Sequence, residues 1–304
     1  MRRRKGISVR ARLARLAFRV LMKRSERDVT IPEIRKRFQK MERLVPSPRR
    51  GTRTEHIDAG GIAGDLVITR ASRADRHLLY LHGGAYMFGS PRLYRHFTWR
   101  MADAARARVL IIDYRLAPEH PFPAALDDAV TAWRWLLDNG GSPSSMAIAG
   151  DSAGGGLALA TMMKLRGEGL PLPAAAAVMS PWTDLALTGP SLHINADADP
   201  MLVAADVPRF AAGYLGGADA RNPYASPLYG DPHGLPPTLI QAGGDEILRD
   251  DAVRMAEKMR SVGCDVELQV WPRMPHTWQL LAPVLPEARE AIDEVARFFA
   301  QHLA

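Results

Sequence analysis

Short apolar runs alternate with helix-length amphipathic segments along most of the chain. From residue 51 onward, the apolar runs have the length expected of strands, and the segments between them have helical periodicity. The predicted strands lie near 54–58, 65–70, 77–81, 108–113, 146–149, 174–179, 237–242 and 265–271. The predicted helices lie near 94–105, 124–138, 153–167, 249–261 and 287–302. This alternation predicts an α/β fold around a mainly parallel sheet.

Two segments stand outside this alternation. The first 45 residues contain an apolar stripe with helical spacing, formed by Leu13, Leu16, Ala17, Val20 and Leu21. A second helix is expected from Thr30 to about Leu44, because Thr30 and Glu33 have the spacing of a capping box. Residues 186–232 are too long and too rich in Pro, Gly and Asp for an ordinary connection, and they are interpreted as an insertion.

The positive charge of the chain is concentrated near its start. The formal net charge is +7, but residues 1–50 contain 18 Lys/Arg and 4 Asp/Glu, whereas residues 51–304 contain 22 Lys/Arg and 29 Asp/Glu. A domain that follows a phosphate backbone would need basic residues on its own surface. The acidic body therefore argues against a nucleic-acid-binding protein.

The basic helix near the start has two interpretations. The favoured one is that its apolar stripe packs on the rest of the protein, and the alternative is peripheral contact of residues 1–24 with an anionic membrane. No secretory signal follows the first charges, and no run approaches the ~20 apolar residues of a membrane span. The single Cys264 permits no intramolecular disulfide and favours a cytoplasmic location.

The first chemical motif is the sequence Gly-Asp-Ser-Ala-Gly at residues 150–154. It lies between a predicted strand and a predicted helix, which is the context of a nucleophile elbow. The flanking glycines suit a turn too sharp for a Cβ atom. Ser152 is therefore predicted to be a catalytic nucleophile, with the alternative that the glycines only allow close packing of a helix on a strand.

A serine nucleophile needs an imidazole base and an acid, which follow it along the chain in this type of fold. Of the downstream histidines, only His276 follows a strong predicted strand by a short loop. Asp245 and Glu246 follow the strand predicted at 237–242, and we predict Asp245 as the acid because it is nearer the strand end. The alternative for Asp245 is an N-cap of the next helix.

The third requirement is a set of N–H donors for the oxyanion. His82-Gly83-Gly84-Ala85-Tyr86 directly follows the strand predicted at 77–81, so that its backbone amides can reach the elbow. We predict the N–H groups of Gly83, Gly84 and Ala153 as the donors. His82 is expected to shape the loop.

Together these motifs resemble the bacterial hormone-sensitive-lipase-like (family IV) esterases of the α/β-hydrolase superfamily. The resemblance rests on the loop 82–86, the block 113–125, the elbow 150–154, Ser180-Pro-Trp182, Asp199-Pro200, Asp245 and His276. It implies an eight-stranded, mostly parallel sheet flanked by helices, with a helical cap. Residues 1–45 and 186–232 would form the cap on a catalytic domain that comprises 46–304. Ala85 departs from the family pattern, which usually has a third glycine there.

The predicted function is that of a serine carboxylesterase acting on small-molecule esters with short to medium acyl chains, without metal or cofactor. A lactone hydrolase or amidase with the same triad, and a non-catalytic receptor on the same scaffold, are the alternatives. A homodimer through the eighth strand and last helix is left open. The residues expected to border the substrate pocket are Tyr86, Met87, Leu16, Val20, Phe210 and Tyr214.

Overall fold

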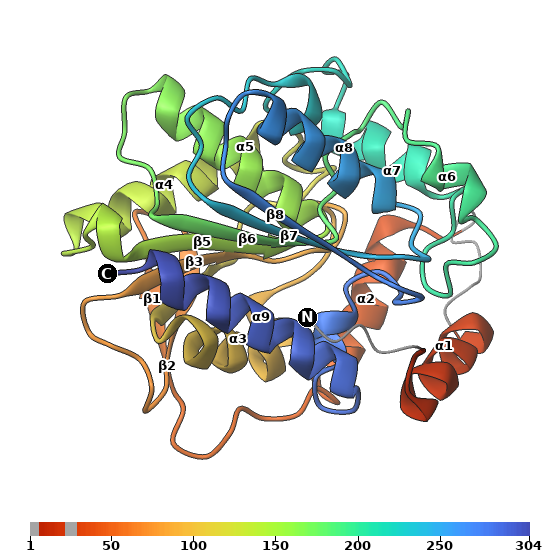
Figure 1. The fold of residues 1–304 in the computed structure, drawn as a ribbon, viewed down its shortest axis with the longest axis horizontal. Helices are drawn as coiled ribbons and strands as arrows, with labels where there is room; N and C mark the ends of the chain where they lie inside the picture. Colours follow the sequence, from red (N-terminus) through yellow and green to blue (C-terminus); the bar gives the residue numbers. More distant parts are fainter. Residues whose placement is uncertain (1–5, 22–28) are drawn as a thin grey trace.

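The computed structural model describes residues 6–21 and 29–304, and an eight-stranded sheet runs through the centre of this part (Figure 1). The strand order is β1-β2-β4-β3-β5-β6-β7-β8. β2 pairs antiparallel with β1 and β4, and every other neighbouring pair is parallel. The strand bounds are β1 Arg53–Asp58, β2 Ala63–Ile68, β3 His77–Leu81, β4 Arg108–Ile112, β5 Met146–Asp151, β6 Ala175–Met179, β7 Thr238–Gly243 and β8 Val266–Trp271.

Helices cover both faces of the sheet, as Figure 1 shows, and a separate apolar core lies under each layer. α3 and α9 pack together on one face, and α4, α5 and α8 cover the other. The predicted eight-stranded, mostly parallel sheet flanked by helices is confirmed. The bounds of these helices are α3 Pro91–Ala105, α4 Ala124–Asp138, α5 Ala153–Gly167, α8 Arg249–Ser261 and α9 Pro286–His302.

One helix begins earlier than its apolar pattern predicted. α3 starts at Pro91 rather than near residue 94, because the Ser90 hydroxyl accepts a hydrogen bond from the Leu93 N–H. Proline at the first helical position has no N–H that would need a partner there. The polar N-cap therefore starts the helix before the first residue of its hydrophobic pattern.

The N-terminal segment contains the two expected helices, α1 (Val9–Leu21) and α2 (Ile31–Glu42). The Glu33 carboxylate accepts a hydrogen bond from the Thr30 N–H at 2.8 Å, as the capping-box spacing predicted. α1 begins after Ser8, whose hydroxyl accepts from the Ala11 N–H. Both helices lie at one end of the sheet, beside the segments around α6 and α7 (Figure 1).

The expected packing of the α1 stripe is wrong. The side chains of Leu13, Leu16 and Val20 are 62%, 60% and 61% exposed, and Ala17 is exposed as well. Ala11 is instead the buried residue of this helix. The placement of the Leu21 side chain lies outside the described part of the chain. The helix turns the larger part of its apolar face away from the protein.

The insertion after β6 contains three short elements and little regular structure. Within residues 186–232, these elements are α6 Ser191–Ile194, α7 Val207–Leu215 and the 3-10 turn Pro227–Tyr229. Several polar side chains of the insertion nevertheless form hydrogen bonds with the rest of the protein. The Ser191 hydroxyl donates to the Ile247 carbonyl at 2.7 Å, so the insertion is tied to the segment that follows β7.

Candidate active site

The turn between β5 and α5 holds Ser152 in strained geometry. Its backbone has φ 54° and ψ −125°, in a region that residues other than glycine rarely adopt. A Cβ at Gly150 would lie 2.2 Å from the Gly154 carbonyl oxygen, and one at Gly154 would lie 2.1 Å from the Leu81 carbonyl oxygen. The two glycines are therefore required by close approach of the backbone, as the motif predicted.

Three side chains from distant parts of the sequence meet at this turn. His276 Nε2 lies 2.8 Å from Ser152 Oγ, and His276 Nδ1 lies 2.6 Å from Glu246 Oε2. An ionised carboxylate only accepts hydrogen bonds, so Nδ1–H donates to Glu246 and Nε2 accepts from the serine hydroxyl. This is the arrangement of a nucleophile, a base and an orienting acid.

The prediction of Asp245 as the acid is wrong, because its carboxylate points to another partner. Asp245 Oδ2 forms an ion pair with Arg15 Nη2 at 2.7 Å, and its side chain is partly exposed. Glu246, which is fully buried, is the residue that reaches the imidazole. Adjacent residues of a tight turn point in different directions, and the hydrophobic pattern does not indicate which of them faces inward.

Hydrogen bonds from four residues fix Glu246 and the turn that holds it. Its Oε1 accepts from the Gly243 N–H at 2.8 Å, and its carboxylate also bonds with the Ser180 hydroxyl. The Asn195 amide donates to the Glu246 carbonyl at 2.8 Å, and Asp199 accepts from the Ile247 N–H. Residues of the insertion thus hold the turn that presents the acid.

The pKa of His276 reflects two opposed effects. Burial by itself lowers the pKa of the imidazole, but the hydrogen bond to Glu246 and the negative charges of Glu246, Asp199 and Asp151 outweigh it. The net effect is a pKa above the ordinary value of 6.5. The charged form of His276 is therefore stabilised, which suits a base that must accept a proton from serine.

We expect kcat/KM to fall as the pH is lowered through a value above 6.5, because only neutral His276 can accept the serine proton. A pH profile of ester hydrolysis under conditions where the fold stays intact measures this directly. An acid limb centred well below 6.5 would contradict the inferred stabilisation of the imidazolium by Glu246.

The oxyanion loop is joined to the elbow by a buried carboxylate that the sequence analysis did not single out. Asp151 accepts hydrogen bonds from the Tyr80 and Tyr94 hydroxyls at 2.7 and 2.8 Å, and from the Gly83 N–H at 3.1 Å. The Gly83 N–H also contacts the Tyr94 hydroxyl at 3.0 Å. The prediction of Gly83 as an oxyanion donor is therefore wrong, since its N–H already has partners.

The next two amides of the loop are free to donate. Within the residues that the structure describes, the N–H groups of Gly84 and Ala85 have no hydrogen-bond partner. The N–H of Ala153 is the first of α5, and such groups have no partner within their own helix. Ala85 has a φ of 53°, which explains why a glycine would suit this position.

His82 has the shaping role that was expected. It is fully buried, stacks on the Tyr114 ring at a centroid distance of 4.2 Å, and its Nδ1 lies 2.8 Å from the Gly83 carbonyl oxygen. Burial lowers the pKa of His82 to about 4, so the ring is neutral at pH 7. Nδ1 therefore donates to the carbonyl and fixes the start of the oxyanion loop.

Four of the six predicted pocket residues lie together between this loop and α7. Tyr86 and Tyr214 are stacked with ring centroids 3.6 Å apart, and Met87 packs against Gly213. Phe210 contacts the same loop through Phe88, edge to face at 5.4 Å. Leu16 and Val20 do not join this cluster. Their prediction as pocket residues is wrong, because α1 turns both side chains to the surface.

Every part of the site lies at the carboxyl ends of parallel strands, where open α/β sheets bind ligands. β3 leads into the oxyanion loop, β5 into Ser152, β7 into Glu246 and β8 into His276. In the described residues, no group of three or more His, Cys, Asp or Glu side chains is arranged to hold a metal ion. The geometry itself supports acyl transfer by an activated serine.

Comparisons with known proteins agree with this geometry. Residues 78–280 match the family model described as the alpha/beta hydrolase fold. An acetyl-hydrolase of Streptomyces hygroscopicus is 49% identical over 230 residues, which cover 75% of this chain and 77% of that protein. An esterase from the bacterial hormone-sensitive lipase family has a crystal structure with a TM-score of 0.92 and 41% identity, covering 98% of this chain and 100% of that one. The structure of EstE5 soaked with p-nitrophenyl butyrate has a TM-score of 0.93 and 39% identity, covering 97% and 99%.

Proposed function

Because this chain belongs to the hormone-sensitive-lipase-like esterases of the α/β-hydrolase fold and is a carboxylic ester hydrolase, we propose that Ser152, His276 and Glu246 form its catalytic triad. The observation that carries this proposal is the continuous hydrogen-bonded chain from the serine hydroxyl through the imidazole to a buried carboxylate. A structural role alone would not require a serine at positive φ at the end of a buried strand.

The reaction proceeds in two steps through an acyl-serine. Ser152 Oγ attacks the ester carbonyl carbon while His276 Nε2 takes the hydroxyl proton, and Glu246 holds the ring through Nδ1–H. The tetrahedral intermediate then collapses, and His276 gives the proton to the departing alkoxide. A water molecule, deprotonated by the same nitrogen, attacks the acyl carbon and releases the acid and free Ser152.

The oxyanion is bound by the N–H groups of Gly84, Ala85 and Ala153. Gly83, which directly precedes the first two of these amides, is hydrogen-bonded to Asp151, and Ala153 is at the N-terminus of α5. Preplaced donors of this kind contribute a factor of about 10²–10³ each to the rate. The positive end of the α5 dipole adds to this stabilisation.

We further propose that residues 1–45 and 186–232 supply the helical cap of a catalytic domain that makes up the rest of 46–304. Contacts between the two cap segments support this division. Arg15 Nη2 lies 3.4 Å from the Ala198 carbonyl oxygen, and Arg19 donates to the Asp197 carbonyl at 2.8 Å. The two segments therefore meet beside the turn that holds Glu246.

The substrates are small esters with short to medium acyl chains. The packed cluster of Tyr86, Met87, Phe210 and Tyr214 closes the region between the oxyanion loop and α7, which limits the length of chain that the site accommodates. The relative from Streptomyces hygroscopicus is named an acetyl-hydrolase, and EstE5 was soaked with a butyrate ester. Both names agree with short acyl groups.

A p-nitrophenyl ester series from acetate to palmitate tests this proposal. We expect kcat/KM to be highest for the short and medium chains and to fall by about tenfold or more for the longest, because a long chain does not fit without moving the aromatic cluster. A fluorophosphonate probe should label Ser152, as mapped by mass spectrometry. Labelling of another residue, or no ester turnover at all, would refute the triad, and a preference for palmitate would refute the assigned chain length.

A further inference from the structure

α1 carries a stripe of large aliphatic side chains that contact solvent. Val9, Leu13, Leu16 and Val20 are 68%, 62%, 60% and 61% exposed. At about 100° per residue, these four positions fall within about 60° of one another around the helix axis. A soluble surface helix normally turns such a stripe toward the core. Here it is turned outward as one continuous face.

The opposite side of α1 is already fixed to the protein. Ala11 is buried, and the Ser8 N–H and hydroxyl both donate to the Glu287 carboxylate, at 2.6 and 3.0 Å. Arg15 pairs with Asp245 and donates to the Arg273 carbonyl at 2.6 Å. The helix is therefore seated by its polar side and its N-terminus, and the aliphatic stripe is not needed to hold it.

Basic side chains border the stripe on both sides. Arg12 and Arg19 fall on one side of it and Arg10 on the other, by the same helical geometry. The helix contains no acidic residue. Residues 1–24 contain ten Lys/Arg and no Asp/Glu, in contrast to the excess of acidic residues in 51–304.

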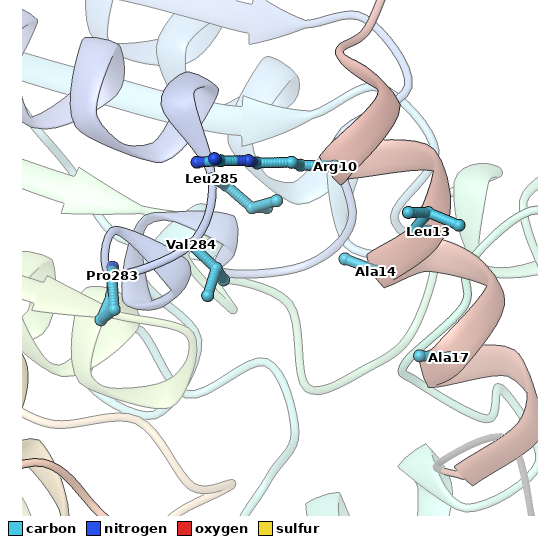
Figure 2. Close-up of a pocket in the computed structure, with 7 residues that line it drawn as sticks. All are labelled: Arg10, Leu13, Ala14, Ala17, Pro283, Val284 and Leu285. Atoms are coloured by element: carbon cyan, nitrogen blue, oxygen red, sulfur yellow. The ribbon is translucent and has the colours of Figure 1, made fainter.

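The apolar surface continues from α1 onto a neighbouring loop. Figure 2 shows Pro283 and Val284 across an open groove from Leu13, Ala14 and Ala17. Val284 is 53% exposed, so this loop adds a further aliphatic side chain to the same face. An aliphatic strip with arginines along its borders is the pattern of a helix that lies in a membrane interface.

We propose that α1 is a membrane-surface helix that binds anionic lipid. The aliphatic stripe enters the boundary between headgroups and acyl chains, and the bordering arginines contact the headgroup phosphates. A nucleic acid would use the arginines but not the stripe, and a second copy of this chain would bring an acidic body but no phosphate surface. The proposed contact is peripheral, because α1 lies along the surface of the protein. Among residues 6–21 and 29–304, no helix has the length and apolar character to cross a membrane.

This surface lies next to two loops of the site. Arg15 links α1 to Asp245, the neighbour of Glu246, and to Arg273, three residues before His276. A membrane bound by α1 is therefore close to the turn and the loop that present the acid and the base. The lipid-binding proposal itself rests only on the exposed face of α1 and holds or fails independently of the proposed triad.

Vesicle co-sedimentation with the full chain tests the proposal. We expect binding to vesicles of phosphatidylcholine with phosphatidylglycerol, weak binding to phosphatidylcholine alone, and loss of binding as salt screens the arginines. Val9→Asp/Leu13→Asp should lower the partition coefficient by at least about tenfold, and Val9→Ser/Leu13→Ser should lower it less. Arg10→Gln/Arg12→Gln should reduce the preference for the anionic vesicles.

The matched control is Val262→Asp/Val270→Asp, which changes two partly exposed valines, one at the C-cap of α8 and one in β8. It should bind vesicles within about twofold of the unchanged chain. Turnover of soluble p-nitrophenyl butyrate should be unchanged in all variants, which shows that the fold and the esterase site are intact.

Equal binding to both kinds of vesicle, or equal loss of binding in the α1 variants and the control, would overturn the proposal. Light scattering provides the other decisive result. A dimer that the Val9→Asp/Leu13→Asp variant dissociates would assign this face to a second copy of the chain instead of lipid.

Discussion

Replacement of Ser152 by alanine is expected to lower kcat for p-nitrophenyl butyrate by about 10⁴–10⁶, while the protein stays folded. The change removes only the hydroxyl that lies 2.8 Å from His276 Nε2, and alanine fits the same backbone geometry. The residual rate comes from binding and from the oxyanion amides. Steady-state kinetics together with thermal unfolding measure both parts of this expectation.

The matched control is Ser144→Ala, a serine in the 3-10 turn before β5. It should have the kinetics of the unchanged chain and should still react with the fluorophosphonate probe at Ser152. A Ser152→Ala variant with kcat within about tenfold of the unchanged chain would mean that another group is the nucleophile.

Replacement of Glu246 by glutamine is expected to lower kcat by about 10³–10⁴. The amide has the shape of the carboxylate but no charge, so it neither stabilises the imidazolium nor selects the tautomer with a proton on Nδ1. The matched change, Asp245→Asn, should cost less than about tenfold, because it removes a partly exposed ion pair with Arg15. Parallel assays of the two variants decide between the neighbouring acids.

The pH dependence provides a second measure of the same pair. Loss of the Glu246 charge removes an effect that raises the pKa of His276, so the acid limb of kcat/KM should move to lower pH in Glu246→Gln. Asp245→Asn should leave this limb in place. The reverse ranking of the two variants, in rate or in pH profile, would mean that Asp245 is the acid of the triad.

The sequence predicted the sheet because strands and helices have different hydrophobic periods. The strand from Met146 and the helix from Ala153 were both located from these periods and from the glycines between them. The same reasoning singled out Ser152 and His276, since each follows a predicted strand with little intervening chain. Chemistry and position along the chain were enough for these two residues.

The neighbouring acids and the oxyanion amides show where this reasoning fails. Position along the chain favoured Asp245 over Glu246, and this choice was wrong because the Asp245 carboxylate pairs with Arg15, which is 230 residues away. The choice between Gly83 and Ala85 as donors depends in the same way on Asp151, whose carboxylate accepts a hydrogen bond from the Gly83 N–H. Which of two adjacent residues in a turn faces the site depends on partners that are distant in sequence, and no periodic pattern in the sequence records it.

For α1, too, distant contacts decided which side chains face the protein. Its amphipathic pattern determined that a helix forms, but not which face contacts the protein. An apolar stripe can pack on the protein, and a row of arginines can form ion pairs and hydrogen bonds with it. The contacts of Arg15 with Asp245 and of Ser8 with Glu287, at the start of α9, leave the stripe facing outward. Local periodicity thus determined the elements of this protein and the strand ends where its chemistry lies. Only the tertiary structure decided which side chains face one another, since that depends on the relative positions of segments that the chain itself keeps far apart.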